Sequence, residues 1–157
     1  NLNKFFQSLS QIHFIIIMSL LSNLIMALLT PVSIMYEKYI GPIGNPSSKI
    51  HNFSIYVFLI LILSPILETL IFQVGTIKIL RHINKCKNNN VIIIFISAIF
   101  FGISHRYSLF YMFATFILGL LFSYSFIIYE RKSQSAFFTV FWIHSFRNFI
   151  ALLTSIL

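Results

Sequence analysis

Five long apolar segments dominate this 157-residue sequence and restrict what it can fold into. They run approximately over residues 12–30, 53–82, 91–106, 108–129 and 136–157. A helix rises about 1.5 Å per residue, so roughly 20 residues cross the hydrocarbon core of a membrane. The first, fourth and fifth segments reach that length, the second exceeds it and the third is short. Because backbone polar groups in lipid must be satisfied internally, we expect an all-α, polytopic transmembrane helical bundle with about five membrane segments.

The composition supports lipid as the solvent of this chain. Hydrophobic residues make up 58% of the sequence and charged residues 9%, too few for the polar exterior of a soluble domain. The net charge of +8 does not indicate a nucleic-acid partner, because the basic residues lie at segment ends and in short loops. Cys86 is the only cysteine, which excludes an intrachain disulfide and a cysteine-based metal site.

The length predicts a single membrane domain over residues 1–157. We interpret 12–30 as a retained span, because it is long for a signal peptide and no clear small-x-small cleavage site follows it. Turn residues over Pro31–Asn52, among them Gly41-Pro42, predict an irregular exposed loop. Positive charge in the loops 83–90 and 130–135 predicts that both loops, and the N-terminus with them, face the cytoplasm.

Glu68 is the most informative single residue. The sequence has three acidic residues, and Glu37 and Glu130 stand beside Lys38 and Arg131 at segment edges. Glu68 alone lies inside an apolar run. An ionisable side chain at membrane depth costs several kcal/mol, so such residues usually face the bundle interior and mark function.

Three further polar side chains, His105, His144 and Asn148, interrupt the later segments. His144 and Asn148 are four residues apart and share one helix face. Glu68 lies about 15 residues before the 83–90 loop and His105 about 14 residues after Val91, roughly 21–22 Å of helix in each case. Asn148 lies roughly 18 Å into the last segment, with His144 one turn shallower. Four polar groups from three helices can therefore converge.

Each of these residues also has a structural interpretation. A histidine or asparagine in a span can simply join two helices by a hydrogen bond, and a buried glutamate can be neutral. Their joint occurrence at compatible depths favours a site. Glu68, His105 and His144 also form a His₂Glu set that zinc accepts. No His-Glu-x-x-His motif supports zinc, so we rank metal second and expect no cofactor.

The same residues carry a resemblance to a known family. Pro65-Ile-Leu-Glu68-Thr-Leu-Ile-Phe-Gln73, Phe101-Gly-Ile-Ser-His105 and His144-Ser-Phe-Arg-Asn148 occur in order. They resemble the three motifs of the CAAX protease and bacteriocin-processing (Abi) family of intramembrane endopeptidases. The resemblance covers residues 53–157 as a peptidase-like core, with 1–52 an extra N-terminal span and loop. It implies that Glu68 and His105 activate water while His144 and Asn148 form an oxyanion hole.

The resemblance also implies a substrate class and a location, namely a membrane-anchored or apolar peptide and a bacterial cell membrane. Two positions depart from the family pattern: Thr69 replaces a second glutamate and Gln73 replaces an arginine. These departures keep open an alternative, a non-catalytic membrane binding or bacteriocin-immunity protein that retains the fold. A transporter subunit that uses Glu68 as a relay is a third hypothesis, disfavoured because no second charged relay residue accompanies it.

Overall fold

The computed structural model describes residues 2–44, 52–132 and 135–156, and these residues form helices and connecting turns without a strand. The helices in chain order are α1 (Leu2–Ser8), α2 (Gln11–Tyr39), α3 (Phe53–Phe58), η2 (Leu59–Leu63), α4 (Ser64–Glu68), η3 (Thr69–Gly75), α5 (Thr76–His82), α6 (Asn90–Ser104), α7 (Leu109–Glu130) and α8 (Ala136–Ile156). The segments η2 and η3 are π-helical, and α3 to α5 form one continuous helix of 30 residues.

The fold confirms the predicted helical membrane bundle. Within the described residues, four helices are long and apolar enough to cross a membrane, namely α2, the α3–α5 helix, α7 and α8. The shorter apolar helix α6 supplies the fifth predicted segment, and it ends at Ser104 before His105. The chain is therefore an integral, multi-pass membrane protein.

The loop predicted to begin at Pro31 is wrong over its first part, because α2 continues through Pro31 to Tyr39. A proline removes one backbone N–H but is tolerated inside membrane helices. The helix ends instead where the N–H groups of Ile40 and Gly41 both donate to the Tyr36 carbonyl and Gly41 takes a φ of 150°. Glycine adopts this positive φ without steric cost. Residues 45–51 of the predicted loop lie outside the described part of the chain.

The long α3–α5 helix has backbone carbonyls that its own N–H groups do not satisfy. In η2 the Ser64 N–H donates to the Leu59 carbonyl, one residue beyond the α-helical acceptor, Ile60. Pro65 has no N–H to offer the Leu61 carbonyl. Two adjacent carbonyls, those of Ile60 and Leu61, are therefore available to side chains of a neighbouring helix.

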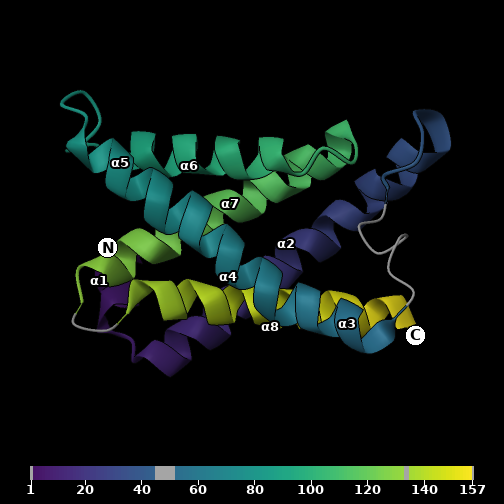
Figure 1. The fold of residues 1–157 in the computed structure, drawn as a ribbon, viewed down its shortest axis with the longest axis horizontal. Helices are drawn as coiled ribbons and strands as arrows, with labels where there is room; N and C mark the ends of the chain where they lie inside the picture. The colour runs from purple at the N-terminus through teal and green to yellow at the C-terminus, as the bar shows by residue number, and fades with distance from the viewer. Residues whose placement is uncertain (1, 45–51, 133–134, 157) are drawn as a thin grey trace.

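Figure 1 shows how the chain connections group at the two ends of the bundle. Helix α1, the α5–α6 connection and the C-terminal end of α7 lie at the left. The C-terminus, the α6–α7 turn and the C-terminal end of α2 lie at the right (Figure 1). The segments predicted to face the cytoplasm thus share one end, which we call the loop end, and the opposite end is the turn end.

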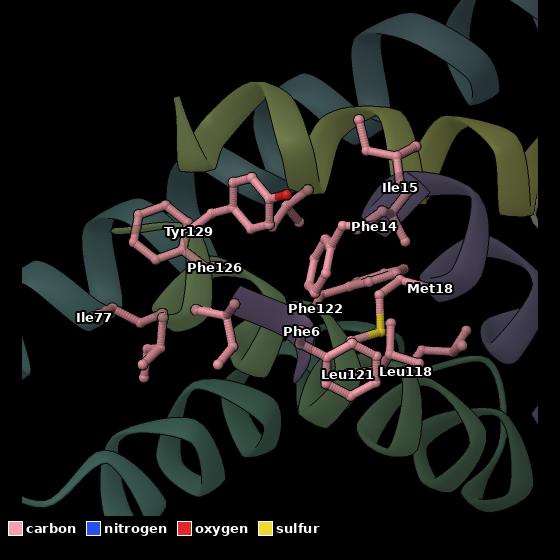
Figure 2. Close-up of a cluster of buried hydrophobic side chains, with 14 of the residues drawn as sticks. Phe6, Phe14, Ile15, Met18, Ile77, Leu118, Leu121, Phe122, Phe126 and Tyr129 are labelled. Atoms are coloured by element: carbon pink, nitrogen blue, oxygen red, sulfur yellow. The ribbon is translucent and has the colours of Figure 1, made fainter. Parts of the chain in front are cut away.

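A hydrophobic core fills the bundle towards the loop end. Figure 2 shows Phe14 and Met18 of α2 packed against Phe122, Phe126 and Tyr129 of α7. The rings of Phe14 and Tyr129 lie 4.6 Å apart between centroids. Tight aromatic packing of this kind excludes water and fixes α2 against α7.

Polar contacts close the loop end. Arg81 of α5 donates to the Glu130 carboxylate at 2.7 Å, to the Lys87 carbonyl at 3.1 Å and to Asn90 Oδ1 at 2.9 Å. One guanidinium therefore joins α5, the following turn, α6 and the end of α7.

Candidate active site

A cavity of about 590 Å³ occupies the turn end of the bundle. Its wall includes Gly44, Tyr107 and Ser155, which lie near the turn end of their segments, and it extends inward to Glu68. All four predicted site residues line it, namely Glu68, His105, His144 and Asn148. The structure thus brings together the polar groups that the depth comparison placed at similar levels.

Glu68 lies at the centre of this group. It is the last residue of α4, between the two π-helical segments. Its Oε2 is 3.5 Å from His105 Nε2 and 3.7 Å from His144 Nε2. These separations exceed a good N–H···O hydrogen bond but are short enough for the groups to share one proton or to contact the same water beside them.

His105 is held in a fixed orientation by the end of α6. It is the C-cap residue, with φ −98° and ψ 62°, so its ring turns out of the helix towards the cavity. Its Nδ1 lies 2.7 Å from the Phe101 carbonyl, which can only accept, so Nδ1 carries the hydrogen. In the neutral ring Nε2 is then an unprotonated base that faces Glu68. Tyr111 stacks on the outer face of the ring, with 5.9 Å between centroids.

His144 occupies a drier position than His105. Its side chain is 6% exposed and lies against the rings of Phe122 and Phe101. Nδ1 is buried and makes no hydrogen bond with a described residue, whereas Nε2 faces Glu68. A buried donor without a partner is costly, so the tautomer with the hydrogen on Nε2 is favoured. This tautomer directs an N–H group into the cavity.

Asn148 and Ser145 bind the two carbonyls that the long helix leaves free. Asn148 Nδ2 donates to the Ile60 carbonyl at 2.9 Å, and Ser145 Oγ donates to the Leu61 carbonyl at 2.7 Å. Because the acceptor is a carbonyl, the orientation of the Asn148 amide is determined, and its second N–H remains available. These bonds fix α8 against η2, and with it the position of His144 relative to Glu68.

Two glycines allow α6 to approach α7 closely beside His105. A Cβ on Gly102 would lie 2.9 Å from both the Met112 carbonyl oxygen and Phe116 Cβ. A Cβ on Gly119 would lie 3.0 Å from Ala98 Cα. Small residues at such crossings permit tight helix packing in membranes. The position of His105 therefore depends on an interface with no room for added atoms.

Thr69 and Gln73, which depart from the family pattern, lie in η3 and are fully buried. Thr69 Oγ1 and both polar atoms of the Gln73 amide make no hydrogen bond with a described residue. The neighbouring carbonyl of Phe72, freed by the π-helical register, accepts from Ser97 Oγ at 2.7 Å. The second π-helical segment is thus joined to α6 by this hydrogen bond and by the contact between the Phe72 and Phe101 rings, while its buried Thr69 and Gln73 side chains have no hydrogen-bond partner among the described residues.

Sequence reasoning left two cavity residues without a role. Arg147 lines the cavity, and its Nε is buried without a hydrogen-bond partner among the described residues. Tyr111 also lines it and stacks on His105. The spacing of Arg147, three residues from His144, indicates the same helix face. Tyr111 carries no comparable signal, because it is one aromatic residue in an aromatic-rich segment.

The zinc alternative can be compared with the arrangement of ligands. Within the described residues, no group of three or more His, Cys, Asp and Glu side chains is arranged to hold a metal ion. Zinc needs its nitrogen and oxygen ligands at about 2.0–2.2 Å from one point. Zinc stays our second-ranked alternative, and a chelator experiment separates it from the metal-free mechanism.

Comparison with protein families places the chain among known proteins. Residues 50–150 match the family described as Type II CAAX prenyl endopeptidase Rce1-like. The chain belongs to this family. All three motifs around Glu68, His105 and His144 lie within the match, which confirms the predicted family relationship. A search of curated proteins found no match to the chain. A search of solved structures found none either.

Membership of the Rce1-like family supports membrane proteolysis of the CAAX type as the general activity. The match begins at residue 50, so α1 and α2 lie outside it. Yet Met26 and Ser33 of α2 line the same cavity as Glu68. The N-terminal span therefore contributes to the wall of the candidate site.

Proposed function

We propose that the chain is an intramembrane endopeptidase in which Glu68 and His105 activate water, and His144 and Asn148 stabilise the oxyanion. The observation that carries the proposal is the position of the Glu68 carboxylate, 3.5 Å from His105 Nε2 and 3.7 Å from His144 Nε2 within one cavity. A carboxylate and an imidazole this close can both reach one water placed beside them and take its proton.

In the proposed reaction, these groups hydrolyse a peptide bond in two steps. The Glu68–His105 pair removes a proton from water, and the oxygen attacks the carbonyl carbon of the scissile peptide bond. The negative charge passes to the carbonyl oxygen, towards the His144 Nε2 hydrogen and the free Asn148 N–H. The pair then gives the proton to the amide nitrogen, the C–N bond breaks, and a carboxylic acid and an amine leave. An oriented oxyanion donor contributes about 2.7–4 kcal/mol in a dry site.

The proposed substrate is a membrane-anchored or apolar peptide. The cavity wall combines the polar group around Glu68 with apolar residues such as Phe110 and Leu118. Such a wall suits an apolar chain whose one peptide bond meets polar groups. We place the peptidase-like core at residues 53–157, with residues 1–52 as an additional part of one membrane domain. A bacterial cell membrane remains our prediction for its location.

A second candidate function is favoured by Thr69 and Gln73. Both are buried, with polar atoms that no described residue hydrogen-bonds, at positions where the family pattern has an acidic and a basic residue. A protein that kept the cavity but lost turnover would act as a non-catalytic binding or immunity protein.

The test is cleavage of a fluorescent, acylated apolar peptide in liposomes by the wild type, Glu68→Gln and His105→Ala. We expect both variants to lose turnover by about 10²–10⁴-fold, the usual contribution of a positioned acid or base. Equal cleavage by all three would contradict the mechanism, and peptide binding without cleavage by the wild type would favour the non-catalytic function. A chelator arm separates the metal alternative: activity lost with chelator and restored by zinc would reverse our ranking.

A further inference from the structure

Arg147 is the one cation in the cavity wall with a buried nitrogen that no described residue satisfies. It is the twelfth residue of the 21-residue helix α8, so it lies near the middle of the span. A cation at that depth is costly unless it is paired or faces a cavity with a ligand. The burial at this depth of a cation without a partner among the described residues therefore suggests that Arg147 meets a ligand in the cavity.

In the part of the chain that the structure describes, no acidic side chain pairs with Arg147. Within the described residues the ion pairs of the acids are Arg81–Glu130 and those of Glu68 with its two histidines. Glu37 is exposed near the end of α2. The charge on Arg147 thus remains available to a molecule that enters the cavity.

The geometry places this charge close to the reaction centre. His144, whose Nε2 is 3.7 Å from Glu68, precedes Arg147 by three residues, roughly 4.5 Å along the helix axis. An extended peptide spans about 3.3–3.6 Å per residue. A group bound to Arg147 therefore lies within a few residues of the bond that Glu68 would act on.

We propose that Arg147 binds a carboxylate of the peptide substrate inside the cavity, and so selects peptides with a negative charge near the cleaved bond. This inference rests on the proposed peptidase function. A guanidinium pairs with a carboxylate through two parallel hydrogen bonds, and it does so most strongly where water is scarce. A lipid phosphate suits the position less well, because phosphates lie at the ends of a span whereas Arg147 lies near its middle.

Binding in the Glu68→Gln background tests the inference without any turnover. The probe is an acylated fluorescent peptide with apolar C-terminal residues, prepared with a free C-terminal carboxylate, with a carboxamide, and with a carboxamide after a final aspartate. We expect the free acid to bind about tenfold or more tightly than the plain carboxamide, the effect of one charge-assisted contact. The aspartate form shows whether a side-chain carboxylate serves as well as a terminal one.

Three double variants test whether the preference for the free acid depends on Arg147. Adding Arg147→Gln should remove the preference for the acid, and adding Arg147→Lys should retain part of it because the charge remains. Adding Arg106→Gln, which changes an exposed cation at the turn end, should leave the preference intact. Equal binding of acid and carboxamide in the Glu68→Gln protein, or an undiminished preference with Arg147→Gln, would overturn the inference. Failure of the wild type to cleave would instead count against the peptidase function and leave the binding result readable.

Discussion

The two ends of this bundle use similar residues for different purposes. At the loop end, Arg81 and Glu130 pair at 2.7 Å and close the structure over an aromatic core. At the turn end, Glu68 and Arg147 share a cavity wall without an ion pair to each other among the described contacts. Charged residues in a membrane protein are thus not equivalent. Arg81 and Glu130 have hydrogen-bond partners and stabilise the fold. Glu68 and Arg147 each have a buried polar atom without a hydrogen-bond partner among the described residues, and both lie in the candidate site.

Next to Glu68 and His105, the largest expected difference between the ends comes from His144. Replacing it with alanine removes the N–H directed towards Glu68, and we expect turnover to fall by about 10²–10³-fold, as for loss of an oxyanion donor. Peptide affinity should change little, because the donor acts mainly in the transition state. Steady-state kinetics in liposomes measures this as a fall in kcat with a nearly constant KM. A rise in KM with kcat unchanged would assign His144 to substrate binding instead.

Adding one methyl group at Gly102 should disturb the packing of α6 against α7 at the turn end without changing any polar group. The new Cβ would meet backbone and Cβ atoms of α7 at 2.9 Å, and neither can move without shifting the helix. We expect Gly102→Ala to lower the free energy of unfolding by about 1–3 kcal/mol and to reduce turnover by displacing His105. Thermal unfolding in detergent and the cleavage assay report both effects. Gly41→Ala is a control for added volume, since no described residue lies within 4 Å of a Cβ there, although the positive φ of Gly41 adds a backbone cost of its own.

Ser145 and Asn148 allow a comparison within the turn end, because both bind carbonyls of η2. Removing either side chain leaves a partly buried carbonyl without its hydrogen bond, at a cost of about 1–3 kcal/mol of stability. Only Asn148 has a further N–H for the oxyanion. We therefore expect similar loss of stability from Ser145→Ala and Asn148→Ala, with the larger loss of turnover in Asn148→Ala. Equal losses of turnover would make Asn148 a positioning residue and no more.

The smallest effect on stability and turnover should come from substitutions at the loop end. The side chains of Arg81 and Glu130 are 24% and 31% exposed, so their ion pair is partly screened by solvent. A double-mutant cycle with Arg81→Gln and Glu130→Gln should give a coupling energy of about 0.2–1 kcal/mol in thermal unfolding and no change in turnover. Loss of cleavage in these variants would show that the two ends are coupled.

Much of this arrangement was predictable because helix geometry is regular. The long apolar run over 53–82 became one helix with the same limits, and counting residues from the connecting loop placed Glu68 and His105 at one depth. Their separation of 3.5 Å follows from that equal depth and from the close α6–α7 crossing beside them.

The remaining features depend on contacts between distant parts of the chain. Proline is a strong turn signal in water, but in lipid a broken helix would expose backbone groups, so α2 continues past Pro31. The hydrogen bond from Asn148 to Ile60 requires the π-helical register of η2, which no local pattern predicts. Whether Arg147 is left unpaired depends on the positions of all three acidic residues in the folded chain, which the sequence pattern does not give.

We propose that Glu68 takes part in catalysis, whereas Glu130 only stabilises the fold. The most direct test measures cleavage of the apolar peptide and thermal unfolding side by side for Glu68→Gln and Glu130→Gln, the same exchange at the two ends. We predict that Glu68→Gln loses at least about 10²-fold in turnover and keeps the wild-type melting temperature, while Glu130→Gln keeps turnover and melts slightly earlier. Wild-type cleavage by a folded Glu68→Gln protein would contradict the account.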